Sequence, residues 1–374
     1  MAVYKDSKGY YVKYRANGKS TTKRGFKTKR SADIFELKLK MSDDEQITLK
    51  FSQVAQDLLE YLESNTQYGS YLKSEQFINK IIIPNVKDKY IDKIDELDCK
   101  NFRDYVQTLT YSTTYKNAII QQYKAIFKHA VKYYRLKRNP SICIDKFKHT
   151  REEKQMQREK EMNIWSVEDF NKFIGYVKTE PYRTFFILLF FTGMRLGECL
   201  ALTWNDLHDS KIDINKSVTH KTKNYSYEIK EPKNNSSVRT ISLNSSLYDY
   251  LMNYKSSEMN LMGFSNNWFI FGRIKPLSPT TIERIKNHAI ANYNSNSTDK
   301  IKKIRLHDFR HSHASNLIAN GVNIVAVSKR LGHSSIDMTL RKYTHLMQKS
   351  DDELINKLEE CSQNVLKKEK KPYN

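Results

Sequence analysis

The chain has 374 residues, of which 39% are hydrophobic, and its 64 Lys and Arg outnumber its 42 Asp and Glu. This length favours two or three domains, and apolar residues gathered into periodic segments exclude wholesale disorder. The net charge of +22 indicates a polyanionic partner, most commonly nucleic acid, although a generally basic protein is the alternative.

The first 45 residues form a small, strongly basic segment, since residues 1–40 contain twelve Lys and Arg but only three Asp and Glu. The alternation in 10–15 predicts a strand, and Asn17-Gly18 predicts a tight hairpin turn after it. We further expect a second strand over 20–24, a third centred on Phe26, and a helix capped by Ser31 that runs to Lys40.

A basic sheet of this size suits a DNA groove, because a β-ribbon can present side chains to base edges. We therefore interpret residues 1–45 as a DNA-binding domain that uses Tyr14, Arg15, Lys23 and Arg24. The alternative is a solvated basic tail, which the aromatic alternation and the Asn-Gly turn disfavour.

Residues 50–150 predict an all-helical domain, because apolar residues recur on helical faces along the segment. One of these helices pairs an apolar face with a lysine face that includes Lys124 and Lys128. Such a face suits contacts to DNA phosphates, and equally a simple solvated surface. The charged segment 146–161 is expected to be an exposed linker.

Residues 162–365 form the largest segment and mix helices with a few strands, and 366–374 are a short basic tail. Ser166 is expected to begin a helix, with Asp169 in the acidic position of a capping box. The predicted fold is therefore multidomain and mainly α. It comprises a small N-terminal three-stranded β-sheet plus helix, a helical domain, and a mixed, mainly α domain with a small β-sheet.

Several classes of protein lack support in the sequence. The four cysteines are far apart, so neither a zinc site nor a disulfide framework is expected, and reduced thiols fit a cytoplasmic protein. The longest apolar run, Phe185–Phe191, is too short to span a membrane. The motifs GxxxxGK[ST], GxGxxG and HExxH are absent, so ATP use, dinucleotide chemistry and zinc proteolysis are not indicated.

Chemistry-bearing side chains gather in the third segment, beginning with TGMRLGE at 192–198. This motif directly follows an apolar run, and the guanidinium of Arg195 placed there costs free energy unless an anion or a carboxylate satisfies it. Glu198, three residues on, is close enough on a helix to orient Arg195. A purely structural Arg–Glu pair is the alternative.

Two further elements supply a lysine and histidines. Lys233 lies in the polar turn of EPKNNSSVRTISL, between strands expected over 225–230 and 238–243. In LHDFRHSHA, His307 and Arg310 are spaced to share a helix face. The histidines at 307, 311 and 313 lack a convincing set of carboxylate partners, so we expect neither a metal nor another cofactor.

The last element is LGHSS followed by Tyr343, ten residues beyond His333. Ser334 or Ser335 can cap the helix that carries Tyr343. Attack of a tyrosine on a phosphodiester builds negative charge that two arginines can clamp. His307 is the natural acceptor of the nucleophile's proton, and Lys233 can protonate the leaving alkoxide. A phosphotyrosine conserves the bond energy, so that rejoining requires no ATP.

These motifs resemble the tyrosine recombinase (phage integrase) family, whose six catalytic positions are all present in order. They are Arg195 in TGMRLGE, Lys233 in PKNNSSVRTI, His307 and Arg310 in LHDFRHSHAS, His333 in LGHSS, and Tyr343 in RKYTH. The helical segment resembles the family's core-binding domain. Residues 1–45 are similar to the arm-binding sheet of integrases from mobile elements of Gram-positive bacteria.

The resemblance implies an integrase that cleaves one strand at a time, with Tyr343 taking the 3′ phosphate and releasing a 5′ hydroxyl. Four subunits would act through a Holliday junction on attachment-site duplex DNA. An excision factor and a host DNA-bending protein are candidate partners, and no membrane is implied. The alternatives are a type IB topoisomerase, which the separate N-terminal sheet disfavours, and a catalytically silent DNA-binding protein.

Overall fold

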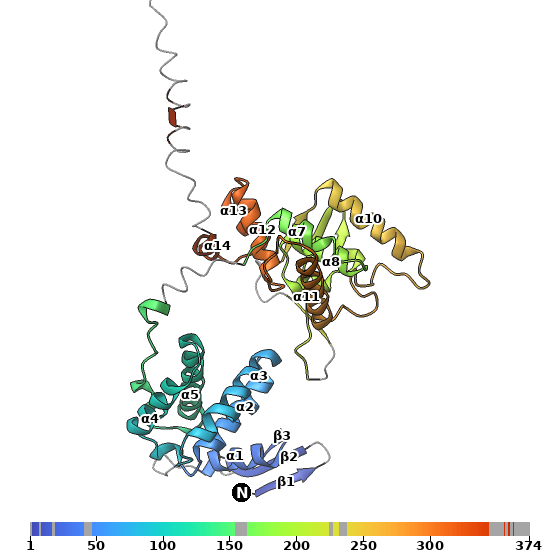
Figure 1. The fold of residues 1–374 in the computed structure, drawn as a ribbon. Helices are drawn as coiled ribbons and strands as arrows, with labels where there is room; N and C mark the ends of the chain where they lie inside the picture. The colour runs from blue at the N-terminus through green and yellow to red at the C-terminus, as the bar shows by residue number, and fades with distance from the viewer. Residues whose placement is uncertain are drawn as a thin grey trace, which may run out of the picture. The chain divides into compact units, whose positions relative to one another are not determined.

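The computed structural model describes residues 2–6, 9–16, 19–40, 47–153, 163–223, 227–231 and 238–343, together with 355, 358, 359 and 362. The chain divides into two compact units, Met1–Glu159 and Lys160–Asn374 (Figure 1). The predicted tail at 366–374 lies outside the described residues. The finer predicted division into 1–45, 50–150 and 162–365 stays a prediction.

The first unit is an antiparallel three-stranded sheet followed by helices. Its longer elements are β1 (Ala2–Asp6), β2 (Gly9–Ala16), β3 (Lys19–Phe26), α1 (Lys29–Lys40), α2 (Phe51–Asn65), α3 (Tyr68–Phe77), α4 (Glu96–Thr108) and α5 (Thr113–Tyr134). Short helical turns occupy Ile78–Ile82, Ile83–Asn85, Ile91–Lys93 and Pro140–Cys143.

The N-terminal sheet differs from the expected one in which segments form its strands. The stretch predicted as two strands, 20–24 and the one at Phe26, is the single strand β3, and the remaining strand is β1. Five residues long and on the sheet edge, β1 is stabilised by pairing with β2 rather than by a pattern of its own. Helix α1 begins at Lys29, so Ser31 lies within its first turn and is not the cap residue.

Alternation along β2 gives the sheet two unlike faces. Val12 is fully buried, and Tyr14 and Phe26 contact the ring of Phe35 on α1, so α1 covers this face. Ile34 of α1 also belongs to the apolar core of the helices that follow. The sheet and the helical segment are therefore joined through α1 within the first unit (Figure 1).

The helical core is built around the long helix α5, where the ring of Tyr123 stacks on Phe102 at a centroid distance of 4.3 Å. Part of the segment predicted to be an exposed linker is attached to this core. Phe147 packs against it, and its backbone exchanges two hydrogen bonds of 2.8 and 3.0 Å with the side chain of Asn117. An apolar residue within the charged run thus anchors the chain, and the linker prediction is wrong for these residues.

The second unit is mainly helical with two small antiparallel sheets. Its elements are α7 (Val167–Ile174), α8 (Tyr182–Thr192), α9 (Leu196–Ala201), β4 (Leu207–His208), β5 (Lys211–Ile214), β6 (Ser217–Thr219), β7 (Glu228–Lys230), β8 (Arg239–Ser242), α10 (Ser245–Met259), α11 (Pro279–Asn296), α12 (Asp308–Ala319), α13 (Ile324–Leu331) and α14 (Ile336–Tyr343). A short helical turn lies at Trp204–Asp206. Buried on nearly every side, α8 contacts α7, α10 and α12 (Figure 1).

The strands predicted on either side of the Lys233 turn do not pair with each other. β7 pairs with β6, whereas β8 pairs with β5 in the other sheet. Two predicted helix starts agree with the structure. Ser166 and Asp169 form the expected capping box, and the Ser335 hydroxyl accepts the backbone N–H of Asp337 at 3.1 Å to cap α14.

A separate small core joins α12, α13 and α14 near the end of the described chain. It contains Ala314, Ile318, Val327, Leu331 and Tyr343. Because Tyr343 is itself a member of this core, packing holds the last turn of α14 against α12.

Candidate active site

Arg195 is fixed by the tight turn that joins α8 to α9. Gly193 ends α8 in the left-handed conformation with φ of 65°, and Arg195 is the residue that precedes α9. A Cβ atom on Gly193 would lie 2.5 Å from the ring of His313, so no other residue fits this turn without movement. The apolar α8 and this glycine therefore set the place of Arg195.

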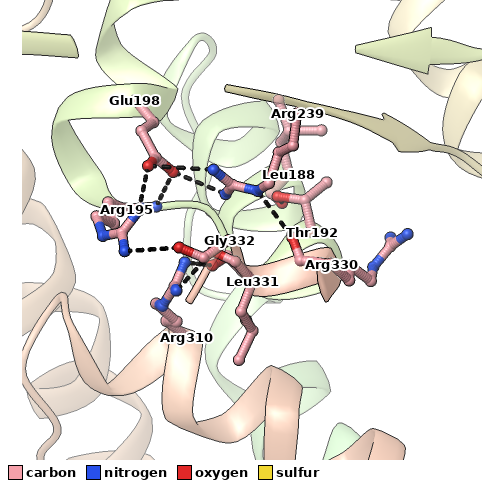
Figure 2. A network of polar contacts seen from close by, with 10 residues as sticks. Leu188, Thr192, Arg195, Glu198, Arg239, Arg310, Arg330, Leu331 and Gly332 are labelled. Carbon is pink, nitrogen blue, oxygen red and sulfur yellow. Dashed lines mark hydrogen bonds and ion pairs between the residues drawn. The ribbon is translucent and has the colours of Figure 1, made fainter. Parts of the chain in front are cut away.

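Glu198 holds two guanidiniums (Figure 2). Its carboxylate accepts Nη1 of Arg195 at 2.6 Å, and Nη2 of Arg239 at 2.8 Å. Glu198 is 4% exposed. Burial alone would raise the pKa of Glu198, but the hydrogen bond and charge of Arg239, together with Arg195, lower the pKa below its ordinary value. The carboxylate is thus ionised and fully engaged.

Arg310 lies beside this pair with a different set of partners. Its Nη2 donates to the Leu331 carbonyl at 2.6 Å (Figure 2), and its Nη1 donates to the Gly193 carbonyl at 2.9 Å. Arg310 is 3% exposed and forms no ion pair with any residue that the structure describes. Burial, followed by the charge of Arg195, lowers the pKa of Arg310 to about 9. An anion bound here would favour the charged form of Arg310 and so offset the effect of burial on its pKa.

His333 follows Gly332, whose carbonyl accepts Nη2 of Arg195 at 3.2 Å. The imidazole Nδ1 lies 2.7 Å from the hydroxyl of Thr339 on α14. Burial, then the charges of Arg310 and Arg195, lower the pKa of His333 to about 4. His333 is therefore a neutral imidazole next to two arginines at neutral pH.

Tyr343 is 1% exposed and its hydroxyl lies 2.7 Å from Nδ1 of His311. Burial raises the pKa of Tyr343 to about 12, although the charge of Arg310 opposes the rise. His311 has a pKa lowered to about 4, first by burial and then by the charge of Lys342. The phenol is consequently protonated at neutral pH and hydrogen-bonded to a neutral imidazole.

Of the six residues predicted to be catalytic, the structure gathers Arg195, Arg310, His333 and Tyr343 around the junctions of α8, α12, α13 and α14. His307 is exposed at the N-terminal end of α12, with its ring 4.8 Å from that of His311. Lys233 lies outside the described residues.

Two residues of this cluster, Arg239 and His311, were not predicted from the sequence to be part of the catalytic site. Arg239 shares its side of β8 with the buried Ile241 two residues on, so the period of the strand already points it inward. His311 precedes Ala314 by three and Ile318 by seven residues, which places it on the core face of α12. In each case the period of the helix or strand indicates that the side chain points inward, which the residue type alone does not.

The residues predicted to contact DNA lie in different surroundings. Lys23 and Lys128 are exposed, and Arg24 lies over the ring of Tyr11 at 5.0 Å on the open face of the sheet. Tyr14 is half-buried against α1, and Lys124 donates to the Ile144 carbonyl. The side chain of Arg15 lies outside the described part of the structure.

The open face of the sheet carries further aromatic and basic residues. Tyr4 and Tyr11 stack at a centroid distance of 5.4 Å, and the ammonium of Lys13 lies 5.4 Å from the centre of the Tyr4 ring. Arg24 also forms an ion pair with Asp6 at 3.1 Å. Stacked rings and cations of this kind suit a nucleic acid surface.

Two negative findings concern the described ranges only. No group of three or more His, Cys, Asp or Glu side chains there could hold a metal ion. None of the helices described has the length and apolar character needed to cross a bilayer.

Comparison with known families gives two matches along the chain. The family model described as "Phage integrase family" matches residues 165–350, and the one described as "Phage integrase, N-terminal SAM-like domain" matches 50–107. The ICEBs1 integrase of Bacillus subtilis (strain 168) is 30% identical over 349 residues, covering 89% of this chain and 90% of that protein.

Solved structures with the same fold include the Tn1549 transposon integrase in complex with a circular intermediate DNA. It shares 19% identity with this chain, covers 84% of it with all of its own length, and superposes with a TM-score of 0.63. A lambda integrase tetramer bound to a Holliday junction shares 15% identity, with 89% of this chain and 95% of that one covered, and a TM-score of 0.52.

Proposed function

This chain belongs to the phage integrase family and is a site-specific tyrosine recombinase, and from that we propose that Tyr343 is its nucleophile. The observation that supports this role most directly is the place of its hydroxyl, at the end of α14 beside the arginine cluster. Tyr343 Oη contacts His311, and the positive charge of Arg310 lowers the pKa of the phenol against the effect of burial.

We propose that Arg195 and Arg310 clamp the scissile phosphate. Both guanidiniums converge on the Leu331–Gly332 carbonyls, and Arg310 has no carboxylate partner among the described residues. Negative charge grows on the phosphate oxygens as the tyrosine attacks, so donors held in place beforehand stabilise the transition state more than the ground state. Glu198, through its hydrogen bonds to Arg195 and Arg239, keeps the first of these donors oriented.

Lys233 and His333 complete the proposed set. Lys233 would give a proton to the 5′ oxygen as it leaves, and neutral His333 would donate a hydrogen bond to the phosphate. His307, exposed at the start of α12, would lie beside the same phosphate. The products are a 3′-phosphotyrosine and a free 5′ hydroxyl, which can attack a partner duplex without ATP.

For the rest of the chain we propose separate contacts with attachment-site DNA. Residues 1–45 would bind arm-type sites through the open face of the sheet, with Tyr11, Lys13 and Arg24 in place of the half-buried Tyr14. The helical segment 50–150 would contact phosphates of the core site through Lys128. Lys124, whose ammonium is already engaged by the Ile144 carbonyl, would contribute less.

We also propose the assembly and setting of the reaction. Four copies would act on DNA through a Holliday junction, as the tetramer in the lambda integrase structure suggests. An excision factor and a host DNA-bending protein would set the direction, and the work would take place in the cytoplasm, where the DNA of a bacterial host lies. Neither a type IB topoisomerase nor a silent DNA-binding protein is favoured by membership of this family.

The test of the proposed chemistry uses DNA from beside the gene, nicked near candidate sites so that cleavage is trapped. Wild-type and Tyr343→Phe protein are incubated with it in EDTA and run on a denaturing gel. We expect a protein–DNA adduct with the wild type alone, because phenylalanine keeps the ring but lacks the attacking oxygen. An adduct with both proteins would overturn the role of Tyr343. Binding without any adduct would overturn the proposed cleavage.

A further inference from the structure

We propose that His311, and not His307, is the base that receives the proton of Tyr343 during strand cleavage. This inference rests on the proposed role of Tyr343 as nucleophile. It gives a catalytic role to a residue that directly contacts the reacting hydroxyl, and it revises the sequence-based expectation for His307.

Geometry separates the two histidines, although His311 lies in the first turn of α12 and His307 directly precedes that helix. His311 Nδ1 lies 2.7 Å from Tyr343 Oη, which is within the reach required of a general base. His307 is one turn earlier, at the exposed end of the helix, and its ring faces the ring of His311. A proton leaving Tyr343 thus meets His311 first.

Burial shields the contact between His311 and Tyr343 from water. Tyr343 is a member of the small core that joins α12 to α14, and His311 is itself buried. In this surrounding a hydrogen bond between the two groups is not exchanged for one to water. Because the imidazole can accept the phenol proton at Nδ1 only when that nitrogen is bare, the reactive tautomer carries its hydrogen on Nε2.

Burial and the charges of Lys342, His307 and Arg310 favour the unprotonated form of His311 before DNA arrives, whereas the carboxylate of Asp308 opposes them. The neutral ring of Tyr343 also faces His311. Burial and Lys342 are the larger influences and lower the pKa of His311 to about 4. A DNA phosphate drawn in by Arg310 brings a negative charge that favours the protonated imidazole. The basicity of His311 therefore increases when substrate is bound.

The proposed step is balanced. The O–H bond of Tyr343 breaks as its proton passes to His311 Nδ1, and the phenol oxygen forms a bond to phosphorus. The bond from phosphorus to the 5′ oxygen breaks, and that oxygen takes a proton from Lys233. When the strands rejoin, His311 returns its proton to the tyrosine and Lys233 recovers its own, so neither an oxidant nor a metal is consumed.

The experiment separates the proton that leaves the nucleophile from the proton that reaches the leaving group. Nicked site DNA is made with either oxygen or sulfur at the bridging 5′ position, since a thiolate leaves without needing a proton. Single-turnover adduct formation is measured for wild type, His311→Asn, His307→Asn and Lys233→Ala, all as full chains. Asparagine can still accept the Tyr343 hydrogen bond near the Nδ1 position but cannot take its proton. DNA affinity and thermal midpoint serve as folding controls.

We expect His311→Asn to lose about 10²-fold or more in cleavage rate on both substrates. Lys233→Ala should be restored by sulfur, and His307→Asn should lose less than His311→Asn. If His311→Asn cleaved either the sulfur substrate or the oxygen substrate at the wild-type rate, the proposed role of His311 would be overturned. A wild-type rate in His311→Asn alongside a large loss in His307→Asn would return the role to His307. Absence of any wild-type adduct would instead overturn the proposed function itself.

A second measurement needs no variant. On the sulfur substrate the wild-type rate should fall toward acid pH, because His311 that already holds a proton cannot accept another. A wild-type rate that does not change with pH would overturn the proposal even if the variant failed to fold.

Discussion

At the scale of single residues, the carboxylate of Glu198 is held between two arginine side chains. It is buried, ionised and hydrogen-bonded to both Arg195 and Arg239. Removing one partner of such a cluster leaves the remaining charges buried without compensation, which costs more than the intact cluster contributes. The carboxylate therefore links the stability of this unit to the orientation of a proposed phosphate ligand.

Glu198→Gln should lower the free energy of unfolding by about 3–5 kcal/mol at neutral pH, measured by urea denaturation. The folded pKa of Glu198 is below its ordinary value, so its stabilisation is present above that ordinary value and is lost as pH falls through the folded pKa. The difference between variant and wild type should consequently shrink in acid.

Glu258→Gln provides the control for this prediction. Glu258 is also a buried carboxylate of the second unit, but its partner Arg273 is half-exposed, and neither residue belongs to the proposed active site. We expect a smaller loss of stability and unchanged strand cleavage. Equal unfolding free energies for Glu198→Gln and wild type would contradict the stabilising role described for Glu198.

The sequence identified the site residues to the extent that each stands in a dense motif. Arg195, Arg310, His333 and Tyr343 were selected in this way, and the structure brings them together. His311 was considered only as a metal ligand, because three neighbouring histidines do not reveal which one meets Tyr343. That distinction depends on how α14 packs against α12. The hydrophobic period predicts which face of a helix packs against its neighbour, but not which side chain on that face meets Tyr343.

At the scale of elements, the turn between α8 and α9 depends on one glycine. Gly193 has φ of 65°, its carbonyl accepts a hydrogen bond from Arg310, and a Cβ there would meet His313. Gly321 after α12 has a similar φ of 80°, but open space surrounds the place of its Cβ. The two glycines share the backbone requirement and differ in the space around them.

Gly321→Ala should therefore cost about 1–2 kcal/mol, the strain of a left-handed residue with a side chain. Gly193→Ala should cost more, because the His313 ring must also move, and it should slow strand cleavage by shifting the Arg310 carbonyl partner. Urea denaturation and adduct formation measure the two effects. Equal losses for the two variants would show that the close approach to His313 is relieved without cost.

Element boundaries were predicted best where a local cap or turn determines them. The capping box at Ser166 and the start of α14 at Ser335 are examples, since both depend on neighbouring residues alone. Strand pairing was predicted poorly. β7 and β8 flank one turn yet join different sheets, and β1 was overlooked, because both outcomes depend on partners distant in the sequence or on the sheet edge.

At the scale of the whole molecule, proposed DNA binding and proposed chemistry use different parts of the chain. Arg195→Ala and Arg310→Ala each remove a proposed phosphate clamp from the second unit and leave the basic surfaces of residues 1–150 intact. Both variants should lose detectable adduct while keeping most of their affinity for site DNA. Gel shift and adduct formation on the same DNA measure this. A variant that fails to bind, although folded, would show that the two tasks are not separable.

The net charge of +22 also predicts how DNA affinity responds to salt. Each phosphate contact releases condensed counterions, so the logarithm of the affinity should fall linearly with that of the salt concentration, by about 0.9 per contact. With roughly 6–10 contacts, affinity should drop about 10³- to 10⁵-fold between roughly 50 and 200 mM salt.

Lys128→Gln, at an exposed lysine of α5, should reduce this slope by about one contact. Lys100→Gln serves as its control, because Lys100 is paired with Asp104 at 2.9 Å on α4 and is not proposed to touch DNA. A slope near zero, or equal slopes for wild type and Lys128→Gln, would mean that the lysine face of α5 is a solvated surface rather than a DNA contact.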